Sequence, residues 1–505
     1  MAARNTELLR GTRPMIAAIS RKHPIVIAFL LAFLLSMCFQ GSRGLWDPDE
    51  GRYTAVALEM LRLGDFIHPM LHREHPHYTK PPLTYWAIAA SVRLFGRNEW
   101  AIRLPYALAF TFTVLLLHGL GRDYQPHRPW LPALVYATSL LPYGAANIVT
   151  TDTPLTLWEM LAVFGFLKAY HAQPGQTKRS IALMWLGFAL AFLTKGPPGL
   201  LPLLAMAVFL LARREWGWLP RAFAPWGLLL FGLIGLSWYL LLVVRTPQLW
   251  SYFVEYELVA RVTSNAHRRH GEWYGGLMVY LPTLLIGSLP WTLLLVRRFR
   301  EMRLSRAWRL RGWLSQLPAR WQFVLAWLLV PLLVFMLARS RLPLYLLPLF
   351  APLSLVIAAM LPASFTQQRR RMGLWTATVL AVLLALRGFA SIIPHKKDAR
   401  ALAQAITAVA PGPYRELIFV DREPRYGLAL YLDAEIEHVC LYKSCERAGF
   451  VQDQALASEI RQRQMPVLYL MRANAMPAVS QRLEREGIPF TLLGEAQEFS
   501  VIEVR

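Results

Sequence analysis

Apolar stretches recur along this chain of 505 residues and constrain its fold more than any other feature. Each is about 20 residues long, and a helix of that length crosses about 30 Å of hydrocarbon. Only 17% of the residues are charged, whereas about 25% is usual for soluble domains. We therefore expect an all-α polytopic membrane bundle, with eleven spans at residues 24–42, 104–121, 131–149, 155–171, 181–195, 199–212, 224–244, 275–296, 321–338, 344–362 and 373–392.

The net charge of +23 at pH 7 could suit a nucleic-acid-binding protein, but Lys and Arg concentrate in alternate loops between the expected spans. The loop 297–320, for example, holds eight arginines. Loops rich in Lys and Arg remain on the cytoplasmic side of a membrane. We therefore expect a multi-pass protein of a bacterial inner membrane, with its amino terminus in the cytoplasm and its tail in the periplasm. Membrane lipids are the expected partners, and nucleic acid is not.

The chain divides into a membrane part and a tail of different composition. Residues 1–393 form the expected transmembrane domain, with two long outer loops at 43–103 and 245–274. Residues 394–505 read as a small α/β domain, because short apolar runs alternate with amphipathic ones. Strands are expected at 417–421, 436–441, 467–471 and 500–504, and helices at 398–410, 454–463 and 478–486.

The tail contains Cys440 and Cys445, two of the three cysteines of the chain. Outside the cytoplasm they could form a disulfide. Two free thiols are an equally good interpretation of the sequence.

Three carboxylates, Asp47, Asp49 and Glu50, follow the first expected span directly, together with Arg52. Charge at a membrane boundary is costly to desolvate, and a cluster of it usually marks a functional site. Asp49 also precedes an amphipathic stretch at 54–63, which we expect to lie along the membrane interface as a helix that Asp49 could cap. Capping explains one carboxylate but not three, so Asp49 and Glu50 are candidate catalytic residues.

A second acidic candidate, Asp152, lies in the short outer turn Thr151-Asp152-Thr153-Pro154. It could cap the helix that Pro154 begins. The turn is expected on the same membrane face as the first outer loop. Asp49 and Asp152 could therefore flank one substrate.

Basic and aromatic residues on the outer face are candidates for binding an anionic substrate. Lys80 is held by a stiff Pro-Pro segment and suits a phosphate, although it could instead extend to lipid headgroups. Two further outer turns add positive charge where the positive-inside rule disfavours it. The full set of candidate substrate-binding residues is Arg52, Tyr53, Tyr78, Lys80, Lys195, Arg339, Arg341 and Tyr345.

Histidines crowd both outer loops and could bind a divalent metal together with Glu74 or Glu255. His267 and His270 are spaced so that they can face one way on a helix. No complete ligand set is evident from the spacing. Solvated or hydrogen-bonded histidines are the alternative, so a divalent metal is a possible cofactor and none is certain.

The order of several short motifs resembles the GT-C membrane glycosyltransferases related to the protein O-mannosyltransferases. Among these enzymes, the motif order is similar to that of the bacterial transferases that add 4-amino-4-deoxy-L-arabinose to lipid A. The motifs are Asp-Glu-x-Arg-Tyr at 49–53, Glu-Met-Leu-x-x-Gly-Asp-Phe at 59–66, Tyr-x-Lys-Pro-Pro-Leu-x-Tyr-Trp at 78–86, Leu-Phe-Gly at 94–96 and Arg-Leu-Pro at 103–105. The turns at 151–154, 195–197 and 341–345 match in order as well.

The resemblance implies a GT-C bundle of up to 13 spans that takes a polyprenyl (undecaprenyl) phosphate sugar as donor on the periplasmic face. Asp49 would be the principal catalytic carboxylate and Asp152 its partner, and Lys80, Arg52 and Tyr345 would hold the donor phosphate. In the lipid A transferases a glutamate precedes the motif lysine and helps to bind a metal. Here that position is Thr79, so the same metal site is not expected.

The sequence therefore predicts an inverting glycosyltransferase with a lipid or glycan acceptor, most simply lipid A. Alternatives are transfer to protein hydroxyls or another envelope glycan, a transporter of lipid-linked sugars and a non-catalytic scaffold. A transporter would place its functional charges near the middle of the membrane. The candidate charges here lie at the outer ends of spans, which favours an enzyme.

Overall fold

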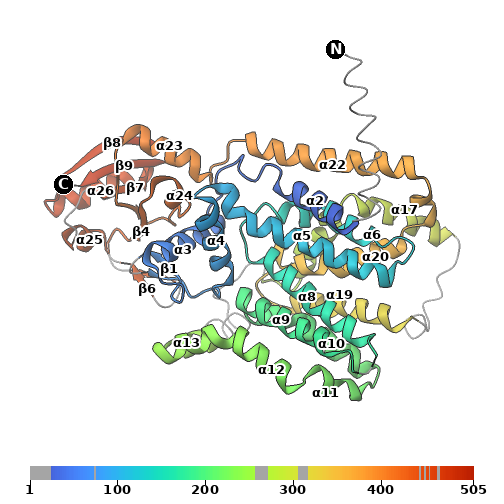
Figure 1. Ribbon diagram of the computed structural model, residues 1–505. Coiled ribbons are helices and arrows are strands. Elements are labelled where there is room, and N and C mark those ends of the chain that lie inside the picture. Colours follow the sequence, from blue (N-terminus) through green and yellow to red (C-terminus); the bar gives the residue numbers. More distant parts are fainter. Residues whose placement is uncertain are drawn as a thin grey trace, which may run out of the picture.

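The computed structural model describes residues 24–72, 75–173, 175–255, 271–304, 317–442, 445–447, 451–453, 455–462 and 467–504. Within them the protein is a helical bundle with a small α/β unit at one end (Figure 1). The candidate metal ligands His267 and His270 lie outside the described residues.

Each of the eleven expected spans coincides with helical structure. The first half of the bundle contains α2 (Pro24–Met37), α5 (Glu99–Tyr124), α6 (Leu131–Thr138), α7 (Leu140–Ala145), α8 (Asp152–Tyr170), α9 (Lys178–Lys195), η1 (Pro197–Leu200) and α10 (Leu201–Ala212). The second half contains α12 (Pro225–Phe231), η3 (Gly232–Leu236), α13 (Ser237–Arg245), α16 (Gly275–Gly287), α17 (Trp291–Leu304), α19 (Ala319–Leu337), η5 (Pro343–Leu349), α20 (Phe350–Met360) and α22 (Arg369–Ile392).

Five helices of the described chain are long and apolar enough to cross a membrane by themselves, or up to six if one bent pair counts as a span. That pair is α16 with the start of α17, which meet at 97°. The other expected spans are shorter, broken, or carry charge, as α8 does with Glu159 and Lys168. The molecule is thus a multi-pass membrane protein, and the number of eleven spans stays a prediction.

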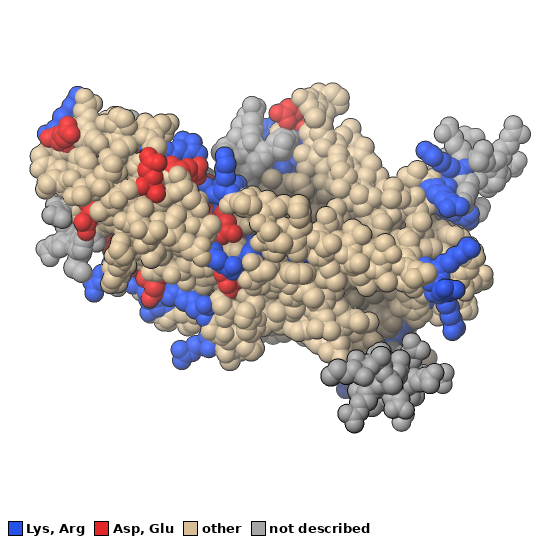
Figure 2. All heavy atoms as spheres, turned by 90° about the horizontal axis from the view of Figure 1, so that it is seen from above, with Lys and Arg blue, Asp and Glu red and all other residues tan. Residues whose placement is uncertain are grey.

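The two ends of the bundle differ in charge. Figure 2 shows mainly Lys and Arg at the end of the bundle away from the α/β unit. Near that unit, Asp and Glu are interspersed with Lys and Arg. Contacts between helix ends hold the basic end together: Arg320 of α19 donates to the Asp123 carbonyl of α5 at 2.9 Å, and Lys168 of α8 pairs with the Asp123 carboxylate at 2.7 Å. This asymmetry is the one that the alternating basic loops predict.

The first outer loop folds into α3 (Asp49–Leu63), the hairpin β1 (Met70–His72) and β2 (His75–Pro76), and α4 (Leu83–Phe95). The helix expected at 54–63 therefore begins earlier, at Asp49, and ends where Gly64 takes a φ of 69°. Its buried residues pack against α4, β1 and the α/β unit. The expected position along the membrane interface stays a prediction.

The α/β unit is built on a five-stranded sheet with the order β4-β3-β7-β9-β8. Strands β4, β3 and β7 are parallel, β9 runs antiparallel to β7, and β8 runs antiparallel to β9. Its main elements are α23 (Ala399–Val409), β3 (Glu416–Val420), α24 (Leu428–Leu432), β4 (Glu435–Val439), α25 (Leu456–Gln462), β7 (Val467–Arg472), α26 (Met476–Arg485), β8 (Phe490–Ala496) and β9 (Phe499–Val504). A separate hairpin pairs β5 (Cys445–Arg447) with β6 (Val451–Asp453).

The strands and helices expected in the tail correspond to β3, β4, β7, β9, α23, α25 and α26. The sequence analysis missed β8, in which exposed and half-buried residues mix irregularly and Gly494 accompanies a shift of register. Cys440 is disulfide-bonded and Cys38 is a free thiol, so the interpretation with two free thiols in the tail is wrong.

The α/β unit shares a hydrophobic core with the first outer loop. Val56 of α3, Ile88 of α4, Ile406 of α23 and Phe419 of β3 are fully buried in one cluster. A second cluster, with Phe110, Phe166 and Phe188, fills the bundle. The outer loop is therefore held between two packed bodies, and this fixes the residues at the start of α3.

A close contact between α8 and α9 supplies a test of this packing. A Cβ at Gly187 of α9 would lie 2.5 Å from the Ala162 nitrogen and 2.8 Å from the Trp158 oxygen of α8. We expect Gly187→Ala to lower the free energy of unfolding by about 1–3 kcal/mol, because two backbones must separate. Thermal unfolding in detergent measures the change. Gly373→Ala in α22, where a Cβ meets nothing within 4 Å, is the control and should not destabilise.

Candidate active site at the α/β end of the bundle

Glu50 is held by six hydrogen bonds. Both of its oxygens accept from Arg43, at 2.6 and 2.9 Å, and from Arg103, at 3.0 and 3.3 Å, and the amides of Trp46 and Val149 donate at 2.8 and 3.1 Å. Burial by itself would raise its pKa, but the two arginines prevail and lower it to about 2. Glu50 is thus a buried, permanently charged anchor.

Arg103 completes this anchor from α5. Besides Glu50 it donates to the carbonyls of Gln40, Arg43 and Gly44, at 2.6, 3.0 and 2.8 Å, so that all five of its N–H groups are used. Arg43 also donates to the Asn147 carbonyl at 2.7 Å. The network ties the segment after α2 to the turn before α8.

This geometry does not favour the catalytic role expected for Glu50, which stays a prediction. Its exposed fraction is 1%, and each oxygen already accepts three hydrogen bonds. A general base must reach the proton that it removes. Glu50 is a positioning residue that fixes the start of α3 and the turn before α8.

Asp49 is exposed at the first turn of α3, directly beside the anchor. The capping interpretation is wrong for Asp49, because Pro48 is the capping residue and no side chain caps the helix. Asp49 acts electrostatically on Arg52 and Tyr53. Arg52 also reaches Glu423 of the α/β unit at 2.9 Å.

Tyr53 is within electrostatic reach of both candidate carboxylates. Burial raises its pKa above the ordinary value, and the negative charges of Asp49 and Asp152 add to that effect. Its side chain also hydrogen-bonds with Thr151 of the turn before α8. Asp49 and Asp152, separated by about a hundred positions in the sequence, therefore act on the same phenol.

Asp152 pairs with Lys195 at 2.5 Å, which joins the beginning of α8 to the end of α9. The Lys195 ammonium lies 4.5 Å from the centre of the Tyr345 ring, at the beginning of η5. The capping role considered for Asp152 is not observed, since Thr151 precedes the helix and no side chain caps it. Three candidates from three distant segments thus form one cluster, which we call the acid–lysine cluster: Asp152, Lys195 and Tyr345.

Lys80 and Tyr78 lie on the loop between β2 and α4. The Lys80 ammonium donates to the Thr79 carbonyl at 3.0 Å, and the Thr79 hydroxyl bonds the His77 ring at 2.9 Å. Tyr78 packs with the aromatic residues of α13, among them Trp238. This loop therefore lies beside α13, which follows Lys195 of the acid–lysine cluster in the chain.

The two arginines before η5 have different environments. Arg341 is buried and donates to the carbonyls of Glu272 and Met336, at 2.6 and 3.0 Å. These bonds hold two turns together, and the role of Arg341 in binding substrate stays a prediction. Arg339 is exposed at the end of α19.

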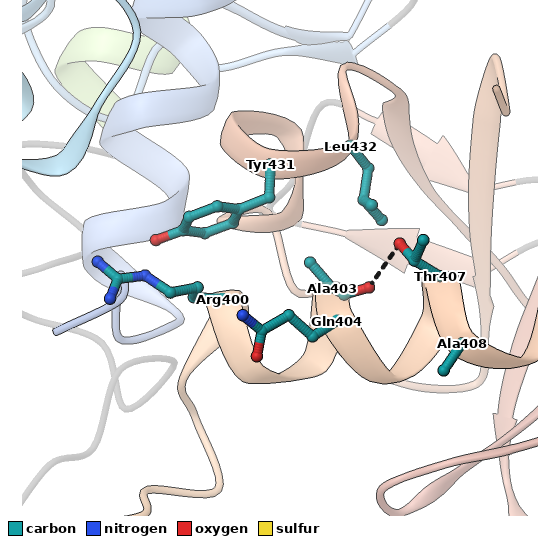
Figure 3. Close-up of a pocket in the computed structure, with 7 residues that line it drawn as sticks. All are labelled: Arg400, Ala403, Gln404, Thr407, Ala408, Tyr431 and Leu432. Atoms are coloured by element: carbon teal, nitrogen blue, oxygen red, sulfur yellow. Dashed lines mark hydrogen bonds between the residues drawn. The ribbon is translucent and has the colours of Figure 1, made fainter. Parts of the chain in front are cut away.

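An apolar cavity of about 450 Å³ lies between α7, α16 and η5. It is lined by Leu141, Ile148, Met278 and Leu344 among others, and Leu344 directly precedes Tyr345 of the acid–lysine cluster. An open depression of similar volume lies between α23 and α24, where Tyr431 and Leu432 face Arg400 and Gln404 (Figure 3). Arg400 is engaged there by Glu99 at 2.6 Å, so this depression serves the junction with the bundle.

The sequence analysis missed a third carboxylate near the cluster. Glu159 of α8 is buried and interacts electrostatically with both Asp152 and Lys195. It lies two helical turns after Asp152, on the same face of the helix. An acidic residue within an otherwise apolar helix was the signal that could have revealed it.

Asp47 connects the site to the α/β unit in a pH-dependent way. It is 3% exposed, and its Oδ1 accepts from the Gly427 amide at 3.0 Å. Burial raises its pKa to about 7, against the opposing effects of the Gly427 hydrogen bond and Arg425 and with small additions from Glu50 and Glu423. The folded protein therefore keeps a proton that the unfolded chain loses near pH 4.

The raised pKa of Asp47 determines how the free energy of unfolding changes with pH. This stabilisation is complete below about pH 4 and is lost as the pH rises through about 7, with a total of a few kcal/mol. We expect hydrogen exchange around Gly427, corrected for intrinsic rates, to increase between pH 5.5 and 8 in the wild type. Asp47→Asn cannot ionise and should abolish that dependence. An equal pH dependence in both proteins would contradict this role for Asp47.

Comparison with known proteins places this arrangement in a family. Residues 79–241 match the family described as dolichyl-phosphate-mannose-protein mannosyltransferase. A relative from Edwardsiella ictaluri (strain 93-146), named undecaprenyl phosphate-alpha-4-amino-4-deoxy-L-arabinose arabinosyl transferase, is 33% identical over 66% of this chain and 58% of its own length. A relative of the same name from Pectobacterium atrosepticum is 31% identical over 74% of this chain. The match covers 66% of that relative's own length, so this chain spans about three fifths of the length of the relatives that it matches.

Solved structures share the fold. The crystal structure of ArnT from Cupriavidus metallidurans bound to undecaprenyl phosphate matches with a TM-score of 0.73 and 21% identity, over 96% of this chain and 98% of that one. The arabinofuranosyltransferase AftD from Mycobacteria matches with a TM-score of 0.50 and 14% identity, over 96% of this chain and 40% of that one. By sequence and by fold, the chain belongs to the GT-C membrane glycosyltransferases related to the protein O-mannosyltransferases.

Proposed function

We propose that the chain is an inverting glycosyltransferase that moves 4-amino-4-deoxy-L-arabinose from undecaprenyl phosphate to lipid A. The observation that carries the proposal is the convergence of Asp49, Tyr53 and the acid–lysine cluster at one end of an apolar bundle. The relatives are named for an undecaprenyl phosphate aminoarabinose, and the ArnT structure holds undecaprenyl phosphate. Both names support this donor.

The reaction would take place on the periplasmic face of a bacterial inner membrane. The site lies at the end with the α/β unit, and the basic loops lie at the other end (Figure 2). The positive-inside rule assigns the basic end to the cytoplasm. No nucleotide is required on the outer side, since the lipid-linked sugar carries its own leaving group.

The apolar cavity between α7, α16 and η5 suits part of the isoprenoid tail of the donor, because its wall is almost wholly aliphatic. Its last lining residue, Leu344, leads directly to Tyr345 and the Lys195 ammonium. A phosphate at the mouth of this cavity would meet Lys195, with Arg52 and Lys80 as further cations. Lys195 would then exchange part of its contact with Asp152 for the phosphate.

Transfer breaks the bond between the anomeric carbon and the phosphate oxygen, and a polyprenyl phosphate leaves. The cations stabilise the negative charge that grows on the leaving group. The acceptor attacks the opposite face of the sugar, so the configuration inverts. A hydroxyl acceptor would give its proton to Asp49. A lipid A phosphate is already ionised, and Asp49 would then orient the acceptor and the positively charged sugar.

Asp49 suits this role better than the other carboxylates. It is exposed, whereas Glu50 is saturated by hydrogen bonds and Asp152 is paired with Lys195. The anchor formed by Glu50 holds the first turn of α3 rigidly. Asp49 therefore needs little reorganisation to meet a substrate.

Mass spectrometry of lipid A tests the proposed function. In a strain that makes the donor but has no transferase of its own, expression of the chain should add one aminoarabinose to lipid A. A radiolabel that stays on polyprenol would indicate a transporter. A label in a different envelope fraction would overturn lipid A as the acceptor.

The roles of individual residues are tested by Asp49→Asn and Lys80→Ala. We expect each to lower transfer by at least about 100-fold, since each removes a group that acts on the reacting atoms. Asp433→Asn is the matched control: this carboxylate is exposed at the same end, pairs with Arg97, and its φ of 51° suits asparagine. Retained transfer in both site variants, with normal membrane insertion, would refute the assignment.

A further inference from the structure

A group of metal-ligating side chains lies where the first outer loop meets the α/β unit. His72 ends β1, and Glu435 and Glu437 lie on β4, the edge strand of the sheet. One potential ligand atom from each residue lies within 4.8 Å of the others. These residues come from parts of the chain that are more than 350 positions apart.

The local structure explains how the three donors converge. Side chains alternate along a strand, so Glu435 and Glu437 point to the same face of β4. The hairpin of β1 and β2 packs against this strand and brings His72 to that face. His72 and Glu437 are each 8% exposed, so both are withdrawn from bulk water.

The spacing suits a tetrahedral ion. Zinc binds histidine nitrogen and carboxylate oxygen at about 2.0–2.2 Å, which separates neighbouring ligand atoms by about 3.4 Å. His72 Nδ1 and Glu437 Oε1 are 3.4 Å apart. A ligand atom of Glu435 lies within 4.8 Å of both, and water can complete a tetrahedron.

Glu435 also has a partner that would orient it. Arg62 of α3 donates to Glu435 at 2.8 Å and is itself held by Glu59. Metal-binding carboxylates are usually hydrogen-bonded in this way by outer partners. Arg62 contacts one oxygen, Oε1, of the Glu435 carboxylate.

We propose that His72, Glu435 and Glu437 bind one divalent transition-metal ion, of which zinc fits best, and that this ion fastens the first outer loop to the α/β unit. The histidine nitrogen disfavours calcium and magnesium, which prefer oxygen ligands alone. The site does not include Thr79, the position at which the family resemblance implies a metal-binding glutamate. Its role is structural, because it holds the segment that leads from α3 to Lys80.

The test is direct zinc binding to the full chain in lipid nanodiscs after removal of metals with a chelator. We expect about one zinc per chain and a melting temperature that rises with zinc concentration. Cobalt should give the intense visible absorption of a tetrahedral site. His72→Ala and the nearly isosteric Glu437→Gln should each lose the bound ion, and His72→Cys, which keeps a zinc ligand, should retain it.

Two controls separate this site from other histidines. His68→Ala removes a histidine of the same loop that pairs with Asp65, and it should leave the stoichiometry unchanged. His267→Ala/His270→Ala should also leave it unchanged. The proposal is overturned if the wild type binds no zinc, if Glu437→Gln binds it as the wild type does, or if the ion is lost only in the His267/His270 variant. None of these readouts depends on sugar transfer.

Discussion

The buried charge network of Glu50, Arg43 and Arg103 is the interaction on which the outer face of this protein depends. One carboxylate joins the segment after α2, the beginning of α3, the turn before α8 at Val149 and the helix α5. Removing one member of a buried ion pair generally costs about 3–5 kcal/mol, because its partner is left charged and unpaired. Here the network has three charges and a net charge of +1, and carbonyl oxygens satisfy the excess N–H groups.

This network explains why neighbouring carboxylates of one short motif have different roles. Glu50 faces inward and is saturated, Asp49 faces outward at the helix start, and Asp47 is buried against Gly427 of the α/β unit. Successive side chains of a helix point in directions about 100° apart, so adjacent acids cannot share one environment. The motif supplies an anchor, a reactive candidate and a contact to the tail within four positions.

The α/β unit also helps to position the start of α3. Its core is continuous with α3 and α4, and its polar groups reach Asp47, Arg52 and Arg62. In the proposed enzyme, the unit would therefore fix the loop that carries Asp49 and Lys80. The acid–lysine cluster is held by α8, α9 and η5, and the bonds of Glu50 to Val149 and of Tyr53 to Thr151 connect it to the start of α3.

The sequence by itself determined the membrane bundle, the small α/β tail, most elements of that tail and the identity of the charged motifs. These follow from local patterns: apolar length, alternation and the placement of Lys and Arg. It also indicated Asp49, Asp152, Lys195 and Tyr345 as candidates. Local patterns contain no information on which side chains meet.

Only the tertiary structure decided how the charges are paired. It joined Asp152 to Lys195, saturated Glu50, bonded Arg341 to two carbonyl groups, brought Glu159 to the cluster and carried His72 to Glu435 and Glu437. Whether an ionised group is an anchor or a reactive group depends on its burial and its partners. Both are supplied by segments that are distant in the chain, and therefore they arise only when the chain is folded.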